Sequence, residues 1–107
     1  MKKYRGSTTI LSALSLLSVM VLWQKSLLLF TVLLVISVLI LASKRSGREI
    51  KIYLLISFLG AFAEILSIYA GAWTYTNPDF LQIPLWLPPL WGIAAIYIVR
   101  KYSRLKE

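Results

Sequence analysis

The carboxyl group of Glu64 is the side chain of this sequence best placed to do chemistry, because it stands alone in an apolar segment. No other charged residue occurs between Ile52 and Tyr75, and a stretch of that length can cross a membrane as a helix. An ionisable group at such depth costs about 2.5 kcal/mol or more and usually faces a protein interior, a cavity or a partner. Glu64 is therefore the first candidate for a functional residue.

The composition narrows the chemistry available to any site. The 107 residues include no cysteine and no histidine, which excludes disulfides, thiol nucleophiles, imidazole bases and Cys/His zinc sites. Only carboxylates, hydroxyls, phenols, indoles and cations remain. We accordingly expect no metal site and no cofactor.

Four apolar segments must position Glu64. Hydrophobic residues make up 59% of the chain, more than a soluble domain of this size could bury in one core. Alternating strands of the barrel type are absent, so helices are the spanning elements. The sequence predicts an all-α integral membrane protein, a single transmembrane domain over 1–107 with no soluble domain. Its four helices, in a compact bundle, are expected at about 8–23, 26–43, 52–75 and 83–99.

The cations predict the orientation of these helices. Of the 12 lysines and arginines, all but Lys25 fall before the first segment, between the second and third, or after the fourth. The positive-inside rule then places both termini in the cytoplasm and the 76–82 loop outside, in a multi-pass protein of the cell membrane. The net charge of +8 fits attraction to anionic lipid headgroups of the bilayer and not a nucleic-acid partner. No small-x-small cleavage site follows the N-terminal cations, so we expect an uncleaved first helix.

Glu64 is expected to point into the bundle. Residues three, four and seven positions away share its helix face, and most of them are small or hydroxylic: Ser57, Gly60, Ala61, Ser67, Ile68 and Gly71. Small residues let another helix approach closely. No cation lies within the apolar part of any segment, so we expect the carboxyl to bond a hydroxyl, an indole or water.

The fourth segment supplies the expected neighbours of Glu64. Pro84, Pro88 and Pro89 interrupt helical hydrogen bonding, so a regular helix should begin near Pro89, after an irregular stretch over Phe80–Leu87. Helical rise places Trp91 at a depth close to that of Glu64. The predicted binding residues are Glu64, Ser67, Gly71, Trp73, Tyr75, Trp86 and Trp91. Trp73, Tyr75 and Trp86 could alternatively be interface anchors, and Glu64 could be a structural residue bonded to a neighbouring hydroxyl or indole.

Part of the chain, about residues 60–91, resembles known membrane proteins. The order of Glu64, Gly71-Ala72-Trp73-Thr74-Tyr75 and Ile83-Pro84-Leu85-Trp86 resembles the small membrane-embedded lycopene cyclase domains and, more loosely, carotenoid hydratases. The stretch from Pro84 to Trp91 is also similar to a family of small four-helix bacterial membrane proteins of unknown function. The cyclase resemblance implies a pair of glutamates just after the proline, where this chain has Trp86 and Leu87. It therefore implies an isoprenoid- or lipid-binding cavity more than an enzyme.

Three functions remain open on the sequence. The first is an apolar, aromatic-rimmed cavity around Glu64 that binds a lipid or isoprenoid. The second is an accessory or assembly subunit whose small-residue faces bind another membrane protein. The third is a small proton-linked transporter that works as a homo-oligomer, in which Glu64 exchanges a proton for substrate.

Overall fold

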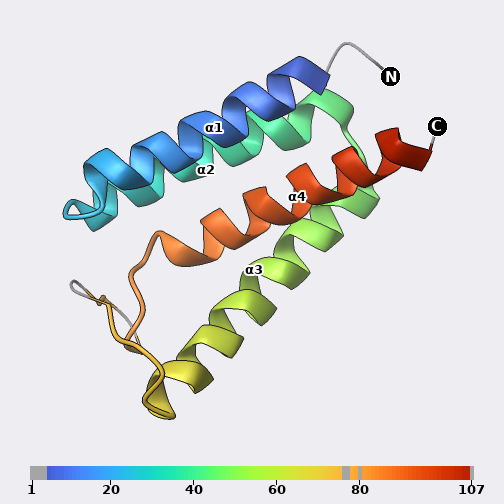
Figure 1. The fold of residues 1–107 in the computed structure, drawn as a ribbon. Helices are drawn as coiled ribbons and strands as arrows, with labels where there is room; N and C mark the ends of the chain where they lie inside the picture. The colour runs from blue at the N-terminus through green and yellow to red at the C-terminus, as the bar shows by residue number, and fades with distance from the viewer. Residues whose placement is uncertain (1–4, 76–77, 80, 107) are drawn as a thin grey trace.

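Four α-helices make up the fold. The computed structural model describes residues 5–75, 78–79 and 81–106. The helices are α1 (Arg5–Leu22), α2 (Ser26–Lys44), α3 (Gly47–Tyr69) and α4 (Leu87–Lys106) (Figure 1). The all-α prediction is confirmed for this part of the chain. Helices α2 and α3 are long and apolar enough to cross a membrane, and α1 contains a shorter apolar stretch, Thr8–Leu22.

Helices α2 and α3 meet at a sharp junction that begins α3 earlier than expected. Arg45 ends α2 in the left-handed conformation, with φ 55°, and its N–H donates to the carbonyl of Leu41. Ser46 caps α3 by accepting from the backbone N–H of Glu49 at 3.3 Å. A serine at this position satisfies an amide that the first helical turn leaves without a partner. Helix α3 therefore starts at Gly47, five residues before the predicted apolar segment.

The other end of α3 also differs from the prediction. The helix stops at Tyr69, and the chain turns at Gly71, where φ is +91°. That left-handed conformation suits glycine, which has no Cβ to clash with the backbone. Trp73 and Tyr75 consequently lie in a returning segment, whereas the sequence places them in the last turns of a helix ending at residue 75.

The prolines start α4 and do not kink it. The helix begins at Leu87, two residues before the expected start at Pro89, and continues to Lys106, beyond the predicted end at residue 99. Pro88 and Pro89 then occupy the first turn, where a missing N–H costs no helical hydrogen bond. Before them the chain is irregular: Leu81 and Gln82 have positive φ angles, and the carboxylate of Asp79 accepts from the N–H of Leu85 at 2.9 Å.

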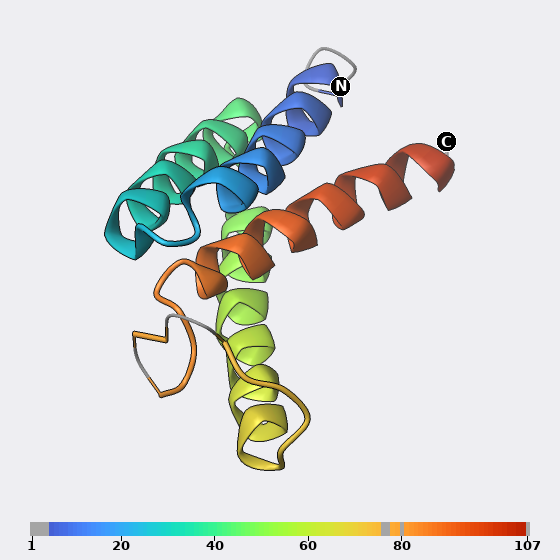
Figure 2. The ribbon, with the colours of Figure 1, turned by 60° about the vertical axis from the view of Figure 1, so that its left-hand side comes forward.

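Helix α4 is the element against which the others pack. α1 and α2 form an antiparallel hairpin, α4 lies against both, and α3 packs chiefly on α4. Figures 1 and 2 show the C-terminal half of α3 diverging from the hairpin, so the arrangement is more open than the predicted compact bundle. The start of α1, the junction of α2 with α3 and the end of α4 lie at the same end of the molecule.

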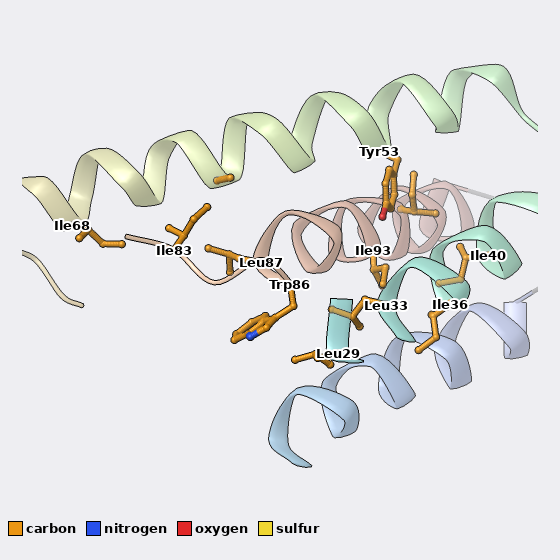
Figure 3. Close-up of a cluster of buried hydrophobic side chains, with 12 residues drawn as sticks. Leu29, Leu33, Ile36, Ile40, Tyr53, Ile68, Ile83, Trp86, Leu87 and Ile93 are labelled. Carbon is orange, nitrogen blue, oxygen red and sulfur yellow. The ribbon is translucent and has the colours of Figure 1, made fainter. Parts of the chain in front are cut away.

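The buried core runs along this central helix (Figure 3). It joins one stripe of α2 to residues of α3, to α4 and to the segment before α4. Its buried hydrophobic members include Leu29, Leu33, Ile36, Ile40, Tyr53, Ala61, Ile68, Ile83, Trp86, Leu87, Ile93 and Ile96. The outward faces are also apolar, as in Val21 and Phe58, whose side chains are 77% and 71% exposed.

Glycines bring α3 and α4 into close contact. A Cβ added at Gly60 would overlap the indole of Trp91, and one added at Gly92 would overlap Tyr53 and Ser57. Each helix thus places large side chains over the other's glycine, which is how small residues permit close helix packing. Ser57, Gly60, Ala61 and Ile68 are buried, so the predicted inward face of α3 is the face that α4 covers.

Candidate functional site

The carboxylate of Glu64 lies between two aromatic donors. The phenol of Tyr75 donates to Oε1, and the indole Nε1–H of Trp91 donates to Oε2 at 2.7 Å. Both partners are uncharged, so the carboxyl has a hydroxyl and an indole beside it, as the absence of cations from the apolar segments predicts. With one donor on each oxygen, Glu64 connects α3 to α4 and to the loop that follows α3.

The turn at Gly71 is what brings Tyr75 to Glu64. Once α3 has ended, the chain folds back along its own last turns, so a residue eleven positions later reaches the carboxyl. The Tyr75 ring also meets the ring of Trp86 edge to face, with centroids 6.4 Å apart and an interplanar angle of 88°. Such T-shaped pairs are a preferred aromatic geometry. Tyr75 is thereby held from two sides.

The close helix crossing places Trp91. Its indole lies over Gly60, one turn before Glu64 on the same face of α3. Because a β-carbon at position 60 would occupy the space of the ring, the orientation of Trp91 depends on that glycine. The hydrogen bond between Trp91 and Glu64 agrees with the prediction from helical rise that these two residues lie at a similar level.

An apolar groove opens beside these three side chains. Its volume is about 380 Å³, which is within the range of small-molecule sites. Helix α1 forms one wall of the groove and the first turns of α4 form another. The hydrogen-bonded side chains of Glu64, Tyr75 and Trp91 form the third. The lining residues are Leu16, Val19, Glu64, Tyr75, Trp86, Leu87, Leu90, Trp91 and Ala94.

Two further cavities adjoin this groove. One of about 510 Å³ lies at the end of α1 and shares Val19, Tyr75 and Trp86 with it. The other, of about 260 Å³, lies between α1 and α4 and shares Leu16, Leu90 and Ala94. The three hollows therefore follow one another along the face that α1 and α4 share.

The predicted site residues divide into two groups. Glu64, Tyr75, Trp86 and Trp91 meet around the groove. Ser67 instead donates its hydroxyl to the carbonyl of Ala63 at 2.9 Å, and Gly71 serves the chain reversal. Trp73 is 45% exposed and is absent from the walls of the three cavities. Within the part of the chain that the structure describes, no group of three metal-ligating side chains is present.

A buried ion pair at the other end of the molecule was not predicted. Arg100 donates through Nε to Oε2 of Glu49 at 3.0 Å and through Nη2 to Oε1 at 2.7 Å. Its remaining donors reach Thr8 Oγ1 at 2.7 Å, Ser43 Oγ at 3.1 Å and the carbonyl of Ile40 at 2.9 Å. Glu49 and Arg100 are both almost fully buried. This cluster joins all four helices through one guanidinium group.

Two signals in the sequence point to this cluster. Ser46-x-x-Glu49 before an apolar segment is a helix N-terminus pattern, and it places a carboxylate at the start of α3. Arg100 follows the fourth segment directly, and antiparallel neighbours bring the start of one helix to the end of the next. The sequence predicts Arg100 only as a cation flanking the fourth segment, whereas the carboxylate of Glu49 lies at the same end of the molecule and pairs with it.

Comparison of the chain with protein-family models, curated proteins and solved structures finds no match.

Proposed function

We propose that this chain is an integral membrane protein that holds a lipid or isoprenoid in the groove beside Glu64. The proposal includes four crossings, of which α2 and α3 are the two best suited by length and composition. The outward apolar faces of the helices, with residues such as Val21, Leu27 and Phe58 mostly exposed, are suited to contact with acyl chains. Both termini are placed in the cytoplasm because of the positive-inside rule.

The observation that carries the ligand proposal is that both oxygens of the Glu64 carboxyl already have hydrogen-bond donors from the protein. Glu64 contributes the only charge to the lining, and its two oxygens already accept from Tyr75 and Trp91. What remains for a ligand is hydrocarbon and aromatic surface, which binds apolar chains. In this proposal Glu64 fixes the two rings that form the wall, and no reaction is assigned to it.

The arrangement of α3 argues against the alternative of an accessory subunit that binds another membrane protein through small-residue faces. The small residues of α3 would have to face a partner, but Gly60 is covered by Trp91, while Ser57 is buried at the contact with Gly92. These residues are used within the chain. The groove between α1 and α4 is the better candidate for an interaction outside it.

The test is to identify what copurifies with the protein. We expect lipid extraction and mass spectrometry to find an amphiphile enriched over the surrounding membrane. The variant Ala94→Trp should lose that enrichment, because Ala94 lines the groove and the added indole would fill it. Ala42→Trp is the matched control, since Ala42 is exposed on α2. Equal lipid content in both variants and the parent, with no enriched species, would contradict the proposal.

A further inference from the structure

Within the part of the chain that the structure describes, the side-chain N–H of Trp86 has no hydrogen-bond partner. The side chain is only 8% exposed, and its Nε1 is a buried atom with no hydrogen-bond acceptor among the described residues. A buried donor without an acceptor destabilises the folded state, so such groups are rare in proteins. An indole N–H can only donate. The missing partner is therefore an acceptor.

Two other buried groups without a partner do not require an outside molecule. Ser12 Oγ and Ser57 Oγ also have no acceptor or donor, but a serine hydroxyl rotates and can bond a carbonyl of its own helix. The Trp86 ring has no such freedom, because its nitrogen is fixed in the ring and the ring packs edge to face with Tyr75. Trp86 is therefore the more informative of the three.

The position of Trp86 relates this donor to the cavities. Its ring lines both the groove beside Glu64 and the larger cavity at the end of α1. Figure 3 shows the nitrogen on the edge of the ring that faces away from α3, toward the side on which α1 lies. The residues of α1 that line the larger cavity are Val19 and Met20, joined by Trp23 just after the helix. The Trp86 N–H thus lies at the larger cavity, which is at the end of the row near the turn between α1 and α2.

Among the described residues, no charged side chain lines the larger cavity at the Trp86 end of the row. The larger cavity is lined by Val19, Met20, Trp23, Thr74, Tyr75, Pro84 and Trp86, all uncharged. The cavity between α1 and α4 is likewise lined without charge. A phosphate or carboxylate placed beside Trp86 would lack a counter-charge among the residues that line this cavity, which is strongly unfavourable in an apolar surrounding.

We infer that the ligand is an amphiphile whose one polar end is an uncharged oxygen acceptor, a carbonyl or hydroxyl oxygen, bonded by the Trp86 N–H. This inference rests on the proposed function and names its ligand class. The hydrocarbon chain then follows the groove between α1 and α4, from Trp86 to Tyr97, the last residue of α4 in the row of cavities. At the helical rise, those eleven positions span roughly 16 Å.

The experiment follows the indole N–H signals of the full chain, labelled with ¹⁵N-tryptophan, in detergent micelles. Four tryptophans give four resonances, assigned by Trp→Phe variants. Three probes with chains of similar length are compared. Methyl hexadecanoate has an uncharged acceptor, heptadecane has none, and hexadecanoate has an anionic acceptor. We expect only methyl hexadecanoate to move the Trp86 N–H proton downfield and to bind about tenfold more tightly than heptadecane, the effect of one hydrogen bond.

The matched variants are Trp86→Phe and Trp73→Phe. Trp86→Phe keeps an aromatic ring but removes the donor, so it should bind the ester and heptadecane equally. Trp73→Phe should keep the tenfold preference, because Trp73 lies outside the cavity walls. If Trp86→Phe does not fold, the resonances of the unaltered chain decide the question alone.

The possible outcomes separate the two proposals. Equal binding of ester and heptadecane with an unmoved Trp86 signal would overturn the inference and leave the lipid-binding groove in place. Tighter binding of hexadecanoate than of its ester would overturn the uncharged polar end. Failure of all three probes to bind, with no lipid recovered from the parent protein, would overturn the proposed function itself.

Discussion

At the scale of single residues, Glu64 acts through the two groups it holds. Its carboxylate accepts from a phenol that comes from the loop and from an indole that comes from α4. Hydrogen bonds to a charged acceptor are stronger than those between neutral groups. The sequence isolates this acid as a single charge, but its structural use is to join three parts of the chain.

Glu64→Gln should destabilise the protein although it preserves the shape of the side chain. The carboxamide can accept from the Trp91 N–H and donate to the Tyr75 hydroxyl oxygen, but both bonds then join uncharged groups and are weaker than bonds to a carboxylate. We expect a loss of about 1–3 kcal/mol in the free energy of unfolding, measured by unfolding in detergent. Ser67→Ala is the control, because that hydroxyl bonds only the backbone of its own helix in the structure. A Gln variant as stable as the control would show that the carboxylate strengthens these two bonds little.

The pair of Glu49 and Arg100 should respond differently to single and double substitution. Glu49→Leu leaves the Arg100 guanidinium buried without its carboxylate, and we expect it to cost about 3–5 kcal/mol. Arg100→Met should cost less, because the Lys44 ammonium still lies 3.8 Å from Oε2 of Glu49. The double variant should cost clearly less than the sum, since no charge is then left buried. Arg48→Met, at an exposed position on the same helix as Glu49, should change stability by less than about 0.5 kcal/mol. Additive losses in the double variant would contradict a coupled pair.

At the scale of elements, the crossing of α3 and α4 sets the geometry of the site. Trp91 over Gly60, with Tyr53 and Ser57 over Gly92, fixes how closely the two helices approach. The hydroxyl groups of Ser37 and Tyr53 lie 2.6 Å apart, and this hydrogen bond joins α2 to the same crossing. The indole reaches the carboxyl only because both glycines lack a side chain.

Gly60→Ala should therefore disturb the site as well as the packing. The new methyl group overlaps the Trp91 ring, and overpacking of this kind costs about 1–3 kcal/mol. We also expect the Trp91 indole N–H resonance to move, because the ring can no longer keep its bond to Glu64. Gly47→Ala provides the comparison within α3, since a Cβ there meets nothing within 4 Å. The prediction fails if both variants leave the Trp91 resonance and the stability unchanged.

The positions of the helices could be predicted from the sequence better than the geometry of the segments that connect them. Apolar length and helical spacing predict α2 and the buried face of α3, because each depends on local periodicity. The end of α3 at Tyr69 and the return of Tyr75 could not be obtained that way, since they depend on a positive φ at Gly71 and on a contact eleven residues away. Likewise, the burial of Arg100 depends on groups from the three other helices, which no single segment reveals.

At the scale of the whole molecule, the positions of the helix ends can be compared with the orientation proposed for the chain in a membrane. The start of α1, the α2–α3 junction and the end of α4 lie together, which is consistent with the proposal of four crossings and both termini on one side. The turn between α1 and α2 lies at the opposite end. The predicted outer loop over 76–82 falls partly outside the described residues, so the α1–α2 turn is the better reporter of that side.

Cysteine labelling in intact cells tests this orientation, since the chain has no cysteine of its own. A cysteine at Gln24, exposed in the α1–α2 turn, should react with an impermeant thiol reagent added from outside. A cysteine at Gly47, exposed at the start of α3, should react only after the membrane is opened. The reverse pattern would show an inverted topology, and labelling of both positions from outside would exclude an even number of crossings with these ends together.

The central place of α4 has a consequence for biogenesis. The helix that contacts each of the others is the last of the four in chain order, and Arg100 bonds a threonine 92 residues before it. During synthesis α1 and α2 can pair as neighbours, whereas α3, which also bonds α2 through Tyr53 and Ser37, obtains most of its packing only when α4 has emerged. Contacts between distant parts of a chain form late. In the proposed membrane setting, lipid or the insertion machinery shelters α3 in the meantime, and a chain cut short before Leu87 should be a substrate for quality-control proteases.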